Sequence, residues 1–96
     1  MNIFIFGRFQ ARAECEAEFR EALRKVVQAS REELGCLEIH GFVSVRDPRM
    51  FFLHSRWADQ ASFDAHAGLP HTLEFLKQTD TLLERPREVT RTTVFA

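Results

Sequence analysis

The spacing of apolar and polar positions changes several times along the chain, and each change marks a new element. A period of 3.6 over residues 15–34 places Phe19, Leu23 and Val26 on one stripe, which predicts an amphipathic helix. Gly35 is the residue type that ends such a helix in a left-handed conformation. Short apolar runs rich in phenylalanine and β-branched residues predict strands. The predicted strands cover residues 2–10, 36–45, 50–57 and 88–95, and the predicted helices cover residues 15–34, 59–67 and 70–83.

The second and third predicted strands are joined by a tight turn. Asp47 precedes Pro48, which cannot donate to a strand ladder, so residues 46–49 connect the two strands as a hairpin. Four apolar residues are expected on one face of the second strand: Leu37, Ile39, Val43 and Val45. The resulting order is β-α-β-β-α-β, which predicts an α+β, ferredoxin-like fold. Right-handed crossovers then place the helices on one face of a four-stranded antiparallel sheet, and we expect residues 1–96 to form a single domain.

The first and third predicted strands are apolar on both faces. In the third strand, Phe51 and Leu53 point to one side of the sheet, while Met50 and Phe52 point to the other. A sheet with helices on one face normally carries polar residues on its free face. Because large exposed apolar patches are rare in monomers, we expect a second copy to cover this face in a homodimer. Residues 94–95, at the end of the last strand, are expected to reach across to that partner.

The composition of the chain argues against nucleic-acid-binding, membrane and disulfide-rich classes of protein. Lys and Arg number 13 and Asp and Glu number 14, so the net charge of −1 gives no attraction to nucleic acid or to an anionic membrane. No apolar run is long enough to span a membrane. Cys15 and Cys36 lack the spacing of a metal or redox motif, which predicts reduced thiols in a cytoplasmic protein.

Candidate chemistry gathers in residues 50–71, which hold His54, His66, His71 and the single tryptophan, Trp57. Histidine is suited to act as a base near neutral pH. No third ligand and no carboxylate partner accompanies these histidines at metal-binding spacing, so the sequence predicts no metal site. His66 is equally well explained as a residue that binds the last free carbonyls of its helix, and His71 as a surface residue of a first helical turn.

We expect Trp57, His54 and His66 to line one pocket between the sheet and the helices. His54 or His66 would be the catalytic base. His54 shares its strand face with Phe52 and Arg56, and an arginine there could neutralise a phenolate. The residues expected to contact substrate are Trp57, Phe52, His71, Arg56 and His40.

Several segments together resemble the antibiotic biosynthesis monooxygenase family. They are ELGCL at residues 33–37, FFLHSRW at 51–57, DQASFDAH at 59–66 and LPH at 69–71. The resemblance covers nearly the whole chain and implies a small dimeric α+β barrel of ferredoxin-like topology. The family includes cofactor-independent monooxygenases that act on anthrones and quinols, haem-degrading enzymes and a sugar-phosphate isomerase.

The chain departs from the family pattern at several positions. Ser55 stands two residues before Trp57, where many members carry glutamate. There is no tyrosine, and His40 and His54 stand where aromatic residues are common. The asparagine of the haem-degrading branch has no counterpart in residues 7–9. The resemblance implies a monooxygenase that needs no cofactor and oxidises a small aromatic substrate with O2. The alternative is a non-catalytic or isomerase-like dimer that binds a small ligand.

Overall fold

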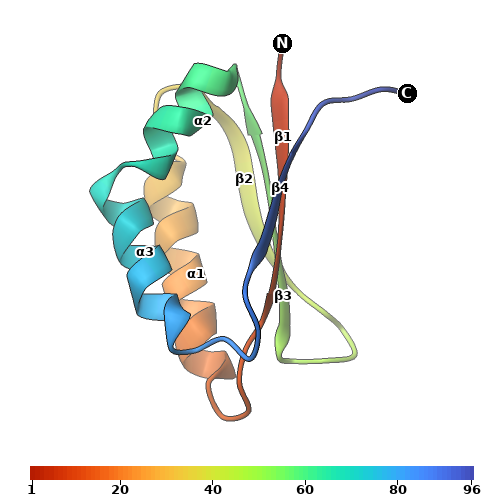
Figure 1. The fold of residues 1–96 in the computed structure, drawn as a ribbon, viewed down its shortest axis with the longest axis vertical. Coiled ribbons are helices and arrows are strands. Elements are labelled where there is room, and N and C mark those ends of the chain that lie inside the picture. The colour runs from red at the N-terminus through yellow and green to blue at the C-terminus, as the bar shows by residue number, and fades with distance from the viewer.

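A computed structural model describes all residues, 1–96, and contains one sheet and three helices (Figure 1). The strands are β1 (Ile3–Gln10), β2 (Cys36–Val43), β3 (Met50–Trp57) and β4 (Glu88–Thr92). The helices are α1 (Glu16–Ser30), α2 (Gln60–Ala67) and α3 (Pro70–Asp80). The strands pair antiparallel in the order β2-β3-β1-β4, and all three helices lie on one face. This confirms the predicted α+β, ferredoxin-like fold.

Strand alternation separates the sheet into a helix-facing side and an open side. In β1, Ile3, Ile5 and Phe9 are buried against the helices, whereas Phe4 and Phe6 lie on the opposite side. The larger core cluster joins Phe9 to apolar residues of α1, α3, β2 and β3. A smaller cluster of Ile3, Ile5, Trp57 and Phe63 lies under α2. The sheet therefore buries one face within the chain and leaves phenylalanines on the other.

Two of the four residues expected on one face of β2 do not lie there. Cys36 pairs with Trp57 and Glu38 pairs with Arg56, so Leu37 is an extra residue at a bulge and is exposed. Val45 lies beyond the end of the strand and is also exposed. The bulge resets the alternation, which a regular period of two does not foresee.

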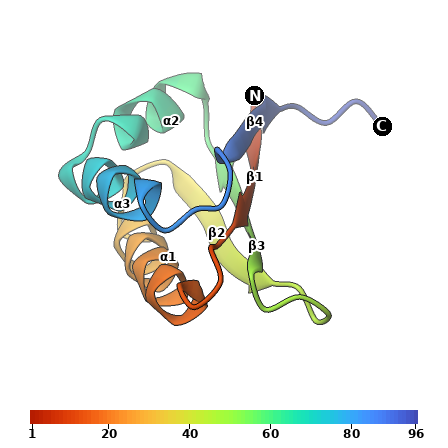
Figure 2. The same cartoon turned by 60° about the horizontal axis from the view of Figure 1, so that its bottom comes forward.

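Helix and strand ends also differ from the predicted ones. Helix α1 ends at Ser30, and a turn of four residues then leads to Gly35, whose φ of 92° is left-handed as expected. Strand β4 ends at Thr92, and the following residues lead away from the sheet on the side opposite the helices (Figures 1 and 2). No helix in the chain combines the length and apolar character that a membrane crossing needs.

Helix α2 begins at a side-chain cap, Asp59, a residue type that is common at this position. The Asp59 carboxylate accepts a hydrogen bond from the Ser62 backbone N–H at 2.8 Å. Hydrogen bonds from Ser62 lower the pKa of Asp59. Because the folded pKa lies below the ordinary value, the stability that this cap contributes is present above the ordinary carboxyl pKa and is lost as the pH falls through the folded one. Ser62 also packs against Gly35, which joins the start of α2 to the start of β2.

We expect Gly35→Ala to lower the free energy of unfolding by about 2 kcal/mol or more. A Cβ at Gly35 would lie 2.3 Å from Ser62 Oγ, and φ is positive there. Gly68→Ala is the matched control, because its Cβ would meet only Ala65 O, at 3.9 Å. Urea unfolding measures both variants. Equal losses in the two would show that the close approach at Gly35 does not limit stability.

Candidate active site

A cavity of about 430 Å³ lies between the sheet and the helices. Ten of its fifteen lining residues are hydrophobic, and they come from β1, β2, β3, β4 and all three helices. Its size falls in the range of about 300–1,000 Å³ that is usual for small-molecule sites. Five lining residues carry polar groups other than the backbone: Ser30, Ser55, His66, Thr72 and Arg87. The cavity is thus an apolar space with a few polar groups at fixed places.

Trp57 supports one end of this cavity from behind. It is fully buried, and its indole Nε1 donates a hydrogen bond to Ser55 Oγ at 2.9 Å. The indole packs against His66, with ring centres 4.6 Å apart, and edge-on against Phe63. Ser55 occupies the position where many family members carry glutamate, and here it serves as the acceptor for the indole. Trp57 therefore holds the His66 ring in place but does not itself line the cavity.

His66 lines the cavity and is bound to a carboxylate that the sequence reasoning missed. Its Nδ1 lies 2.8 Å from Glu33 Oε2, and Thr72 Oγ1 is 3.4 Å from the same nitrogen. His71 Nε2 lies 2.6 Å from the same Glu33 oxygen. The side-chain exposures are 12% for His66, 9% for Glu33 and 30% for His71. One nearly buried carboxylate oxygen is thus shared by two imidazoles.

Three local features of the chain bring this group together. Glu33 lies in the turn between α1 and β2, just before Gly35. His66 lies in the last turn of α2, and His71 lies in the first turn of α3. The break at residues 68–70 turns the chain so that both rings meet the carboxylate. Glu33 is distant in sequence from both, and the one signal for it was its place in the segment ELGCL.

The same three groups have the donor set of a two-histidine, one-carboxylate metal site. Their ligand atoms all lie within 4.8 Å of one another. The separations of 2.6 and 2.8 Å, however, are hydrogen-bond lengths. Ligands of tetrahedral zinc, at about 2.0–2.1 Å from the ion, lie about 3.3 Å apart. As they stand, the three side chains form a hydrogen-bonded group, and the expectation that the histidines lack a carboxylate partner is wrong.

His54 lies on the opposite face of the sheet from His66. Its Nε2 is 3.3 Å from Glu38 Oε1, and its ring lies 4.9 Å from the Phe6 ring. Positions 54 and 57 differ by an odd number, so a strand points them to opposite sides. The expectation that Trp57, His54 and His66 line one pocket is therefore wrong.

Three other expected site residues also lie on the open face. His40 pairs across the sheet with His54, and Arg56 lies 4.0 Å from Glu38. Phe52, which precedes His54 in the row of side chains from β3, is exposed. The structure thus divides the expected residues into two groups, with only His66, Trp57 and His71 at the cavity end.

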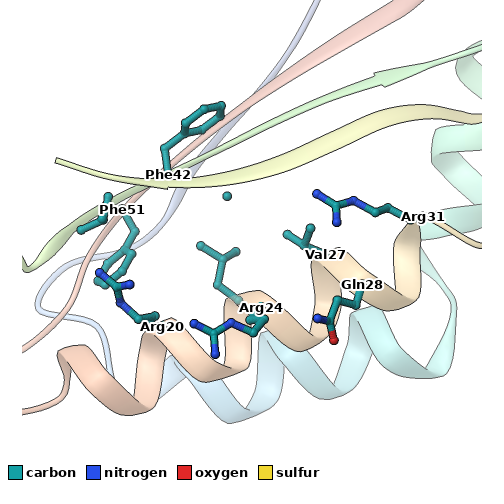
Figure 3. A pocket seen from close by; sticks show the side chains of 10 residues that line it. Arg20, Arg24, Val27, Gln28, Arg31, Phe42 and Phe51 are labelled. Atoms are coloured by element: carbon teal, nitrogen blue, oxygen red, sulfur yellow. The ribbon is translucent and has the colours of Figure 1, made fainter. Parts of the chain in front are cut away.

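A second hollow, of about 260 Å³, lies on the outside between α1 and β2 (Figure 3). Arg20, Arg24 and Arg31 stand around it, above apolar side chains. The Arg31 guanidinium donates to the Ile39 carbonyl at 3.0 and 3.2 Å, which covers part of the free edge of β2. No histidine or carboxylate lines this hollow, so it offers no base.

Cys36 lies near Glu33 but is not set up as a nucleophile. Burial raises the pKa of the Cys36 thiol, and the Glu33 carboxylate raises it further, against a smaller opposing effect of Arg31. The thiol form is therefore favoured at neutral pH. The side chain packs against both apolar clusters, as a small hydrophobic residue.

The family model for antibiotic biosynthesis monooxygenases matches residues 2–78. The chain belongs to this family. The relative Rv0793 of Mycobacterium tuberculosis, provisionally named a monooxygenase, is 30% identical over 88 residues, which are 92% of this chain and 86% of Rv0793. The Synechocystis protein sll1783 is 24% identical over 87 residues, and the matched region spans 59% of its length.

Solved structures of the family have the same fold. The structure of Rv0793 superposes with a TM-score of 0.94 at 26% identity, covering 100% of this chain and 97% of that one. SnoaB of Streptomyces nogalater, a cofactor-independent oxygenase, has a TM-score of 0.86 at 15% identity, covering 97% of this chain and 92% of its own. At 15% identity the likeness to SnoaB shows the fold alone.

Ser55→Ala should lower the free energy of unfolding by about 1–3 kcal/mol, because it leaves the buried indole N–H of Trp57 without an acceptor. Trp57→Phe should lower the free energy of unfolding less in the Ser55→Ala background than in the native chain, because the indole N–H has already lost its acceptor there. Urea unfolding of the four proteins of this cycle measures the coupling. If the losses in the free energy of unfolding are strictly additive, the Trp57–Ser55 hydrogen bond contributes nothing to stability.

Proposed function

We propose that the protein is a cofactor-independent monooxygenase that oxidises a small aromatic, anthrone- or quinol-like substrate with O2 in the cavity between sheet and helices. The observation that carries this proposal is the position of His66. The ring lines the cavity while its Nδ1 is bound to the nearly buried Glu33 carboxylate. Family membership and the oxygenase activity of SnoaB, a protein of the same fold, support the reaction class.

The contact with Glu33 prepares His66 to act as a base. When Nδ1–H donates to the carboxylate, Nε2 carries the lone pair, and no protein group is bound to it. The carboxylate fixes the ring and stabilises the imidazolium that forms on proton uptake, as the acidic residue does in catalytic triads. His71 binds the same oxygen and so positions Glu33. We therefore assign His66 as the base and His71 as a positioning residue.

The chemistry needs no external reductant. His66 Nε2 takes a proton from an acidic C–H or O–H of the substrate, which leaves an electron-rich anion. The anion reduces O2 and forms a carbon–oxygen bond, giving a peroxide that takes up the proton. Loss of water then leaves a carbonyl group, so that a CH2 group and O2 become C=O and H2O. The apolar lining of the cavity keeps water from the anion.

His66→Gln should lower kcat by about 10²–10⁴-fold, the usual contribution of a general base. His54→Gln is the matched control, because His54 lies on the other face of the sheet, and it should retain activity. Oxygen uptake with a panel of anthrones and quinols identifies the substrate and measures both variants.

Full activity in His66→Gln would remove the assigned base. If no compound of the panel is oxidised although several bind, the chain is instead a non-catalytic or isomerase-like small-ligand-binding protein.

We further propose that the open face of the sheet joins two copies. Family members are typically dimeric. Phe6, Phe42 and Phe52 are exposed on this face, which is a large apolar surface for one chain to leave in water. Glu38 contacts both His54 and Arg56 within the same face, so burial would not leave the Arg56 guanidinium without a partner. The chain after β4 leads away on the side opposite the helices (Figure 1), and Val94 and Phe95 in this segment are exposed.

Light scattering at micromolar concentration should give twice 11.2 kDa. Phe6→Glu should shift the mass toward that of one chain, because it places a charge in the centre of the apolar face. Leu73→Glu is the control, since Leu73 is equally exposed, at 53%, but lies on α3 away from this face. A monomeric native chain, or equal effects of the two variants, would contradict the proposed interface.

We also propose a cytoplasmic location, on the basis of the cysteines. Cys15 and Cys36 are both free thiols in the structure. Free, partly buried thiols persist in reducing compartments.

A further inference from the structure

Two polar atoms that belong to cavity-lining residues are buried without a hydrogen-bond partner. They are Ser30 Oγ and Arg87 Nε. Ser30 is fully buried, and its hydroxyl does not bond back to the α1 backbone as serines in helices often do. The Arg87 guanidinium uses Nη2 to bind the Leu76 carbonyl at 3.1 Å and the Asp80 carboxylate. Buried polar groups without partners are rare, and each calls for an explanation such as a ligand.

These two atoms mark opposite ends of the cavity. Ser30 lies at the His66 end, because its carbonyl accepts from the Glu33 N–H and the Glu33 carboxylate binds His66. Trp57, behind His66, pairs with Ile3 of β1. Arg87 directly precedes Glu88, which pairs with Arg8 at the other end of β1. Between these ends, the β1 residues that line the cavity are Ile5 and Phe9, four steps apart, which corresponds to about 14 Å of strand at about 3.4 Å per residue.

We propose that Ser30 and Arg87 are specificity-determining residues that select an elongated aromatic ligand with an oxygen at each end. One oxygen binds the Ser30 hydroxyl beside His66, and the other accepts the Nε–H of Arg87. The inference rests on the proposed function only in placing the ligand in the same cavity. It deepens that function, because it states which anthrones or quinols the cavity prefers.

The apolar middle of the cavity explains why the oxygens must be at the ends. Between the two polar ends the lining includes Ile5, Leu53 and Phe75, which offer no hydrogen bond. An oxygen placed there would lose its water without gaining a partner. A ligand with one oxygen would leave Ser30 or Arg87 unsatisfied. Flat fused rings with oxygens at opposite ends satisfy both atoms and fill the apolar space.

The arrangement also predicts which end of the ligand reacts. The oxygen at Ser30 lies beside His66, so the ring at this end loses its proton and meets O2. Arg87 contacts the far oxygen and does not touch the reacting atoms. Removal of Arg87 should therefore weaken binding more than it slows the bound substrate.

Calorimetry under anaerobic conditions can test this selection with two ligands that share one ring system. Naphthalene-2,6-diol has hydroxyls at opposite ends, and 2-naphthol has one. The native chain should bind the diol about 10-fold more tightly, the value of one added hydrogen bond. The indole resonance of Trp57, the single tryptophan, should shift with both ligands and so report binding at the cavity.

Ser30→Ala and Arg87→Met should each reduce the preference for the diol to about 1, because only one end then binds an oxygen. Arg85→Met is the matched control, since Arg85 is exposed and does not line the cavity, and it should keep the 10-fold preference. Arg87→Met also loses contacts to α3, so each variant is first checked by urea unfolding. Comparing the affinities of the native chain for the diol and for 2-naphthol tests the inference without any variant.

Equal affinities of the native chain for the two ligands would overturn the inference, as would an unchanged preference in a folded Arg87→Met or Ser30→Ala chain. A 10-fold preference without oxygen uptake from any anthrone or quinol would uphold the selection and contradict the proposed catalysis. Oxygen uptake without a preference for the diol would support the proposed catalysis and contradict the proposed selection. The two proposals therefore fail separately.

Discussion

The shared carboxylate of Glu33 is the interaction on which the candidate site depends. It binds His66 and His71 through one oxygen, and it comes from the turn between α1 and β2, where the Glu33 N–H donates to the Ser30 carbonyl. Its position follows from the left-handed Gly35, which packs against Ser62 at the start of α2. The turn after α1, the start of α2 and the break before α3 thus form one unit. A change in any of them would move the carboxylate away from the rings.

Strand alternation places the cavity and the proposed dimer interface on opposite faces of the sheet. The side chains of Ser55 and Trp57 point toward the helices and support the cavity, whereas those of His54 and Arg56, from the same strand, point to the open face. On that face the charges are paired with Glu38, and the remaining surface is rich in phenylalanine. One strand therefore contributes to both the candidate site and the proposed interface, through different residues.

The structure shows what replaces the family pattern at position 55. With serine at position 55, the carboxylate that many relatives carry there is absent, and the hydroxyl binds the indole of Trp57 instead. The carboxylate near the cavity is instead that of Glu33, which binds His66. The unsatisfied Ser30 and Arg87 add polar groups at the two ends of an otherwise apolar lining. The proposed selectivity for ligands with an oxygen at each end depends on these two groups.

Local signals in the sequence determined the order of elements, the fold class, the cap at Asp59, the left-handed Gly35 and the apolar open face, because each depends on the spacing of neighbouring residues. The sequence also singled out His66, which lines the cavity, and Trp57, which packs against it from behind. It could not place Glu33 between two histidines, since that contact joins a turn to two helices more than thirty residues away. Strand alternation, by contrast, is a signal in the sequence that already places His54 and Trp57 on opposite faces, so one pocket for both could have been excluded without the structure. The bulge at Leu37 arises only in the pairing of β2 with β3, and the partnerless atoms of Ser30 and Arg87 arise only when the helices pack on the sheet, so tertiary structure alone decided them.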